Sequence, residues 1–420
     1  MENRHMKLHI PPALKHRRFF YLWLGLLISV AGSQMQIWAL FWHIRELTDQ
    51  PIALGGIGAA RIVPVVLFAL IGGAFADTYN RRKILFITQT SQVLIAAALG
   101  YFTLTGEITI WHIYALTALQ AVALAFDLPA RQALVPNLVP AKDLSNAFSM
   151  TSIAFQTGSI VGPALTGISI ALAGQSAVYF INAATYIAII LAIVLIGEVT
   201  QKRNVTTRGV SREAIVDGIQ FILNHPVILS TMVLDFVATF FASANTLMPI
   251  IARDVLNVGV VEYGWLSAAA SVGAVLAALI VSQVQELRKQ GPLFLGSVVV
   301  FGVATIIFGI SRLFVLAWCA LAVTGAADSV STIIRNTIRQ LQTPDEIRGR
   351  MTSVNQIFFQ GGPQLGEIEA GLVAQFFGAP FAILTGGIGC ILGVLWIARK
   401  WPQMTAYNGD EPVLAGAMAD

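Results

Sequence analysis

The sequence predicts an all-α membrane protein in which twelve transmembrane helices form two pseudo-symmetric six-helix bundles. Three observations lead to this fold class: the composition, the spacing of the apolar segments and an internal repeat. Of the 420 residues, 56% are hydrophobic and only 11% are charged. A soluble domain carries about 25% charged residues, so the composition excludes a soluble globular protein.

The apolar segments give the number of helices. An α-helix needs about 20 mainly apolar residues to cross a bilayer. Twelve segments meet this requirement, and they are 19–43, 53–76, 84–104, 109–127, 147–172, 176–197, 226–250, 263–284, 292–310, 313–334, 351–377 and 379–398. Because the number is even, both chain termini are expected on the same side of the membrane.

The positive charges indicate which side that is. With the loops assigned to alternate sides, 22 of the 26 Lys and Arg residues fall on the side of the termini. Arg45, Arg253 and Arg312 fall on the other side, and Arg61 lies inside the segment 53–76. Cytoplasmic loops carry an excess of Lys and Arg. We therefore expect a multi-pass protein of the cytoplasmic (inner) membrane with both termini in the cytoplasm.

A polar segment, residues 198–225, separates six predicted helices from the next six. The expected organisation therefore has five parts. In chain order they are a cytoplasmic N-terminal arm (1–18), an N-terminal six-helix bundle (19–197), a cytoplasmic central linker (198–225), a C-terminal six-helix bundle (226–398) and a cytoplasmic tail (399–420).

An internal repeat relates the two halves. A shift of 204 residues aligns IAFQTGSIVGPALTG (153–167) with IFFQGGPQLGEIEAG (357–371), with six identities in fifteen positions. These passages lie in the fifth and eleventh predicted helices, which are equivalent positions in the two halves. Parallel six-helix repeats occur in secondary transporters, whose substrate site lies between the repeats near the middle of the membrane.

One loop resembles a signature of the major facilitator superfamily. GGAFADTYNRRK (72–83) is similar to the cytoplasmic gating loop of that family, and the matching positions include Gly73, Asp77, Arg81 and Arg82. The resemblance implies that Asp77 faces the N-terminus of the eleventh helix. It also implies that the two arginines pair with an acid at the end of the fourth helix, where Asp127 stands. A turn that also serves as a topology signal is the alternative.

Two further passages extend the resemblance over nearly the whole chain. GSIVGPALTG (158–167) is similar to a motif of the superfamily's exporters, and Gly158, Gly162, Pro163 and Gly167 match it. Glycines at this spacing also permit close helix packing on their own. FDLPARQALVPNLVPAKDLSNAFS (126–149) resembles the subgroup that includes macrolide-efflux and enterobactin-export proteins. The resemblance implies a major facilitator fold, a monomer and transport outward.

Five ionisable residues lie within predicted spans, where such residues commonly mark transport pathways. Arg61, Glu367 and Glu369 lie at equivalent depths in 53–76 and 351–377. The resemblance implies that these two helices face each other across the halves, so we expect an arginine–glutamate contact there, either as a gate or as a permanent bridge. Residues two apart on a helix point about 200° from each other. Glu369, on a glycine stripe, is the predicted partner of Arg61, and Glu367 is predicted to face water or the cavity.

Asp235, Asp328 and Glu367 are the candidates for proton coupling. A carboxylic acid held away from water can keep a proton at neutral pH and release it when it is exposed to another compartment. Asp235 and Asp328 lie on helices that, by the resemblance, line the cavity, in the cytoplasmic half of the membrane. Local hydrogen bonds to neighbouring helices are the alternative.

The same helices carry aromatic and amide residues that suit an amphiphilic, drug-sized ligand. This predicted substrate cavity consists of Gln34, Trp38, Gln120, Phe236, Phe240 and Asn245. No Walker loop, zinc-ligand spacing or nucleophile elbow is present. We therefore expect neither an enzyme nor a cofactor, metal or nucleic-acid partner.

The predicted function is export of a hydrophobic or amphiphilic small molecule, of the antibiotic or siderophore type, by alternating access and in exchange for protons. Two alternatives remain. One is a metabolite importer or uniporter without proton coupling, and the other is a polytopic membrane enzyme or lipid-handling protein.

Overall fold

The computed structural model describes residues 11–199, 219–242, 244–284 and 287–409. In these ranges every regular element is helical. The N-terminal half contains α1 (Arg17–Leu47), α2 (Pro51–Thr78), α3 (Arg81–Thr105), α4 (Ile110–Leu134) and α5 (Leu144–Ile196). Short 3₁₀ turns at Pro12–Lys15, Val135–Asn137 and Ala141–Asp143 flank them.

The C-terminal half begins with α7 (Pro226–Phe241) and continues through short helical turns, α8 (Met248–Ile250) among them, that end at Val255. The long helices that follow are α9 (Val260–Val281), α10 (Gln290–Ile310), α11 (Phe314–Gln342), α12 (Asp345–Phe377) and α13 (Ala379–Lys400). The short helix α14 (Pro402–Ala406) closes the described chain.

Twelve membrane crossings follow from these helices. Within the described ranges, ten segments are long and apolar enough to span a bilayer. One of them, Ala141–Ile196, contains two crossings, because Gly174 breaks α5 with a φ of 80°. That conformation favours glycine. The 33-residue α12 supplies the remaining crossing. The predicted fold class is therefore confirmed.

Local sequence signals set several helix ends. The side chain of Asn80 accepts hydrogen bonds from the backbone N–H groups of Arg82 and Lys83, so it caps α3. Thr109 and His112 form a reciprocal capping box at the start of α4. Such caps satisfy the free N–H groups of a first helical turn. Gly378, with a φ of 87°, separates α12 from α13.

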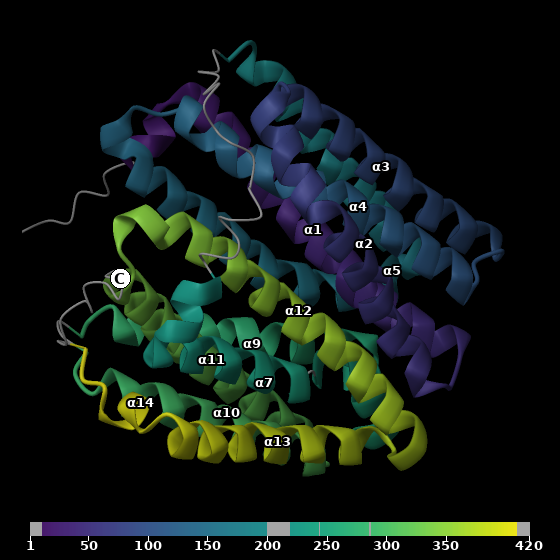
Figure 1. Ribbon diagram of the computed structural model, residues 1–420. Coiled ribbons are helices and arrows are strands. Elements are labelled where there is room, and N and C mark those ends of the chain that lie inside the picture. The colour runs from purple at the N-terminus through teal and green to yellow at the C-terminus, as the bar shows by residue number, and fades with distance from the viewer. Residues whose placement is uncertain (1–10, 200–218, 243, 285–286, 410–420) are drawn as a thin grey trace, which may run out of the picture.

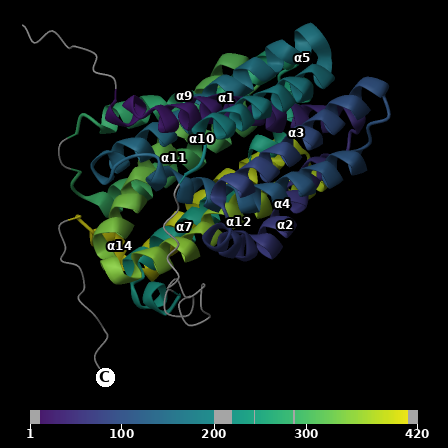
Figure 2. The ribbon, with the colours of Figure 1, turned by 90° about the horizontal axis from the view of Figure 1, so that it is seen from above.

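The helices form two groups that meet along two seams. In Figure 1 the purple-to-blue helices α1–α5 lie above the green-to-yellow helices α7–α14. The seams are formed by α2 with α12 and by α5 with α9, and Figure 2 shows α2 beside α12. Glycines permit the close approach, since Gly55 faces Gly371 in one seam and Gly167 faces Gly264 in the other.

Two helices extend further than predicted. Helix α4 ends at Leu134 and α11 at Gln342, whereas the apolar segments end at 127 and 334. Arg131, Arg335 and Arg339 are therefore buried within helices, although the charge count assigned them to loops. Removing these three from the 22 leaves 19 positive charges on the side of the termini, so the asymmetry persists.

Candidate functional site

An ion pair joins the two halves inside the membrane. Arg61 of α2 lies 3.4 Å from Glu367 of α12, measured from Nη1 to Oε1. Each residue is ten positions from the helix end opposite the chain termini, which is about 15 Å along the axis. Glu367 is buried, and its Oε2 has no hydrogen-bond partner among the described residues. The contact expected between Arg61 and a glutamate of the other half is therefore present.

The partner is the other glutamate, so the predicted pairing of Arg61 with Glu369 is wrong. The sequence favours Glu369 because it lies on the glycine stripe that contains Gly366. That stripe packs against α7, inside the C-terminal half. The face of α12 toward α2 carries Glu367 and Gly371, which pack against Gly55. Glu367 therefore does not face water or a cavity as predicted, and Glu369 is half-buried.

A second ion pair is buried within the C-terminal half. Asp235 of α7 lies 2.5 Å from Nη1 of Arg335 on α11, and their side chains are 2% and 4% exposed. Nη1 of Arg335 also donates a hydrogen bond of 3.3 Å to the hydroxyl of Ser331. A buried charge is tolerated in a membrane protein only when it is paired. The alternative of a contact from Asp235 to a neighbouring helix is therefore present, as an ion pair.

Asp328 forms the exposed edge of the same cluster. Its Oδ1 lies 3.7 Å from Nη1 of Arg335, and its side chain is 52% exposed. A cavity of about 10 Å³, the size of one water molecule, lies among Asp235, Asp328, Ser331 and Arg335. Asp328 is fourteen residues from either end of α11, and its predicted position in the cytoplasmic half of the membrane stays a prediction.

Arg335 is the functional candidate that the sequence analysis missed. It was counted as a loop residue because the apolar segment ends one position before it. The internal repeat holds the signal that identifies it, since the shift of 204 residues that aligns helices five and eleven also aligns Arg131 with Arg335. Each arginine is buried in its helix and paired with an aspartate, Asp127 for Arg131 and Asp235 for Arg335.

The predicted pairing of Arg81 and Arg82 with Asp127 is wrong. Asp127 accepts hydrogen bonds from Thr88 at 2.9 Å and Gln89 at 2.6 Å, and it pairs with Arg131 one turn later on α4. Because α4 continues to Leu134, Asp127 lies about 10 Å inside the helix end.

Both arginines instead donate to backbone carbonyls. Arg81 reaches Ala133 at 2.9 Å and Arg82 reaches Ile193 at 2.8 Å. Gly72 allows α2 to approach Ala125 closely, whereas Gly73 has open space around it. The side chain of Asp77 lies outside the described residues, so its role stays a prediction.

The glycine motif of α5 makes the close contacts expected of it. A Cβ on Gly158 would lie 2.5 Å from Val30, and one on Gly162 would lie 2.5 Å from Gln34, both on α1. Gly167 instead faces the start of α9 in the other half. Pro163 is buried in the same helix, and its carbonyl lies near Gly264 of α9. The motif therefore packs α5 on both sides, within its own half and across the seam.

Polar contacts between the halves gather at the end opposite the termini. Arg45 at the end of α1 lies 2.8 Å from Asp254, which precedes α9, and it also pairs with the nearby Asp49. The hydroxyl of Tyr263 on α9 donates to the carbonyl of Trp38 at 2.9 Å. Its ring lies 4.9 Å from that of Trp42. These contacts and the Arg61–Glu367 pair join the two halves at this end of the molecule.

The predicted substrate cavity is divided between two places. Trp38 is buried under Tyr263, and Gln34 reaches Ser159 on α5 with a hydrogen bond of 3.4 Å. Phe236 and Phe240 stack at 6.0 Å in the other half, and Asn245 is exposed.

Gln120 belongs to a polar network of the N-terminal half. It accepts a hydrogen bond of 3.1 Å from Gln36 and donates one of 3.3 Å to Tyr186. Gln36 in turn accepts one of 2.7 Å from Asn182. The members of this network lie on different helices, so no local sequence pattern predicts it.

Known proteins resemble this chain over nearly its full length. A family model described as transmembrane secretion effector matches residues 11–412. The multidrug efflux pump Tap of Mycolicibacterium fortuitum is 27% identical, covering 84% of this chain and 88% of that protein. The staphyloferrin A transporter of Staphylococcus aureus is 25% identical, covering 91% and 94%. The enterobactin exporter EntS of Citrobacter koseri is 24% identical, covering 96% of each.

Solved structures show the same fold. A bacterial homologue of the human lysosomal transporter Spinster, in an inward-facing and unoccupied conformation, superposes with a TM-score of 0.71 at 13% identity, covering 95% of this chain and 97% of that one. A variant of the nucleoside transporter NupG also gives a TM-score of 0.71, at 12% identity, covering 90% and 99%.

Proposed function

Since the chain belongs to the transmembrane secretion effector family of major facilitator transporters, we propose that it exports an amphiphilic small molecule by alternating access. The observation that carries this proposal is the seam between the halves. At the end opposite the termini it is held by two separate ion pairs, Arg45–Asp254 and Arg61–Glu367, and by Tyr263. Contacts of this kind can separate without unfolding either bundle, because each bundle has its own helix packing.

The relatives support the direction and the class of substrate. Three proteins that cover most of this chain are named for drug efflux, for enterobactin export and for staphyloferrin A transport. The substrate is therefore a drug-like or siderophore-like molecule. The excess of Lys and Arg supports a cytoplasmic position for the end with the termini. The closed end then faces outward, and the protein works as a monomer of two bundles joined by the linker.

Proton exchange is assigned to the buried carboxylates. Asp235 shares Arg335 with the half-exposed Asp328, so a proton that reaches Asp328 frees Arg335 to pair with Asp235 alone. Oε1 of Glu367 pairs with Arg61, and its Oε2 has no hydrogen-bond partner among the described residues. The carboxylate can therefore accept a proton when the seam opens. Asp49 does not take this role, because the hydrogen bond from Arg45 holds its pKa below the usual range.

Transport measurements in cells test the direction. In bacteria that lack their own efflux pumps, expression of the protein should lower the accumulation of at least one compound from a panel of antibiotics and fluorescent amphiphiles. Raised accumulation would indicate an importer instead.

Proteoliposomes test the coupling. Flux of the compound found in cells should follow an imposed pH gradient, and Asp235→Asn should abolish that dependence. Flux that ignores the gradient in the wild-type protein would remove proton exchange and leave a uniporter. Glu107→Gln, at an exposed acid in a loop, is the matched control and should behave like the wild type.

A further inference from the structure

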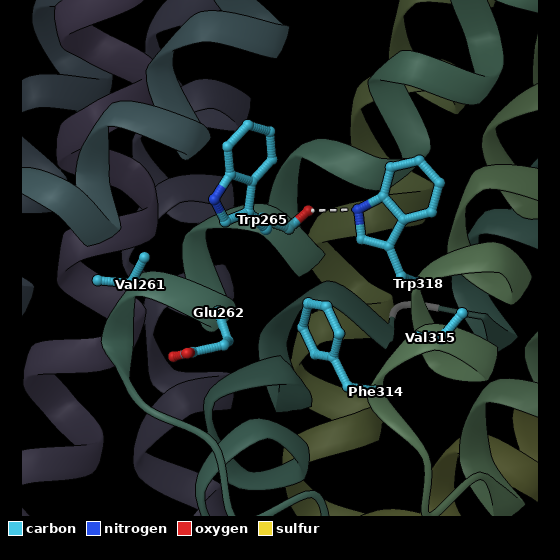
Figure 3. Close-up of a pocket in the computed structure, with 6 residues that line it drawn as sticks. All are labelled: Val261, Glu262, Trp265, Phe314, Val315 and Trp318. Atoms are coloured by element: carbon cyan, nitrogen blue, oxygen red, sulfur yellow. Dashed lines mark hydrogen bonds between the residues drawn. The ribbon is translucent and has the colours of Figure 1, made fainter.

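A groove opens between the first turns of α9 and α11, beside the α5–α9 seam. Its volume is about 430 Å³, and it is lined by Val261, Glu262 and Trp265 of α9 and by Phe314, Val315 and Trp318 of α11. Figure 3 shows the rings of Trp265, Trp318 and Phe314 around an open space with Glu262 at its edge. The indole N–H of Trp318 donates to the carbonyl of Trp265 at 3.1 Å, which fixes that ring.

The groove lies at the starts of two membrane-spanning helices, where lipid headgroups are expected. Val261 is the second residue of α9 and Phe314 is the first of α11, and both helices begin at the end opposite the termini. Its flank is apolar and open, since Trp265 is 49% exposed and Val315 is 71% exposed, and Leu313 and Leu316 beside it are exposed too. In a membrane-spanning protein such a flank is covered by acyl chains.

The lining selects a positive group. Tryptophan and phenylalanine faces attract an ammonium ion within about 6 Å of the ring centroid. The carboxylate of Glu262 adds to this attraction and repels a headgroup with net negative charge. The exposed Arg312, two residues before Phe314, supplies a positive charge at the same level for a phosphate.

We propose that this groove binds the ammonium headgroup of a zwitterionic phospholipid of the phosphatidylethanolamine type. The ammonium lies among Trp265, Trp318 and Glu262, the phosphate lies toward Arg312, and the acyl chains follow the exposed flank of α11. The site is distinct from the Arg61–Glu367 pair and from the Asp235–Arg335 cluster, and it does not depend on what the protein transports.

Photo-crosslinking tests the proposal on the full chain in nanodiscs. The probe is a phosphatidylethanolamine with a diazirine near the headgroup. Label is expected on the peptides that contain residues 261–265 and 314–318. Excess phosphatidylethanolamine should suppress it, and phosphatidylglycerol should not. Glu262→Gln and Trp318→Leu should each lower the labelling about fivefold, as expected for loss of one contact to a cation.

The control is Glu107→Gln, which removes an exposed acid at the same end of the molecule outside the groove. It should leave the labelling unchanged. Glu262 is itself exposed, so its neutralisation does not threaten folding. Labelling that survives Glu262→Gln, or equal competition by phosphatidylglycerol, would overturn the proposal. Loss of the label on addition of tetraphenylphosphonium, with no competition by phosphatidylethanolamine, would show that the groove holds a soluble organic cation instead.

Discussion

Three arginines within the helices, Arg61, Arg131 and Arg335, each have a carboxylate partner. At the scale of single residues, the difference between them is where that partner lies. The partner of Arg131 is one turn away on the same helix, whereas that of Arg335 comes from another helix of its bundle. Only Arg61 reaches across the seam, so only its pair has to break when the halves separate.

The Arg335 pair should therefore contribute to the stability of the C-terminal bundle, in addition to its proposed role in proton exchange. Arg335→Met leaves Asp235 buried without a charged partner, and such a loss typically costs about 3–5 kcal/mol. We expect a clear drop in the thermal unfolding temperature in detergent. The double variant Asp235→Asn with Arg335→Met should recover most of the lost unfolding temperature. If the single variant unfolds like the wild type, the pair is not structural.

The Arg61 pair should instead control opening. In Glu367→Gln the bridge loses its charge, and outer-end accessibility, measured as cysteine labelling at an introduced Ser271→Cys in the seam, should rise about tenfold. The matched variant Glu369→Gln, two residues away on another helix face, should show no change. Equal effects of both variants would contradict the assignment of Glu367 as the partner.

At the scale of helices, the number of helices could be predicted from the sequence, but which helices pack against each other could not. Apolar length depends on the chain alone, so all twelve spans were found. The ends of α4 and α11 were misplaced because a buried arginine looks like a loop residue until its partner is known. Asp235 and Arg335 are one hundred positions apart, and no local pattern connects them. Likewise, the glycines beside Glu369 indicated close packing but not which helix they pack against.

The α5–α9 seam offers a test at the same scale. A Cβ on Gly264 would lie 2.9 Å from the carbonyl of Pro163, a contact with backbone that cannot move aside. Gly264→Leu should force α9 from α5 and favour the state that is open at this end. Spin labels on the two halves should report a longer distance by double electron–electron resonance. Gly73→Ala, which meets open space, should leave the distance unchanged.

At the scale of the whole molecule, the two seams and the gate at one end make a mechanical prediction. If the halves rock about the seams, opening at the outer end must break Arg45–Asp254 and Arg61–Glu367 together, although the pairs lie on different helices. The variant Arg45→Ala should then raise labelling near Arg61 as well as near Arg45, because one motion releases both. In a double-mutant cycle, the changes that Arg45→Ala and Glu367→Gln cause in the free energy of outward opening should add, and labelling near either pair should report the same total, since the two distant pairs act on one equilibrium. Labelling changes confined to the neighbourhood of each substitution would mean that the outer end loosens without the halves moving as rigid units.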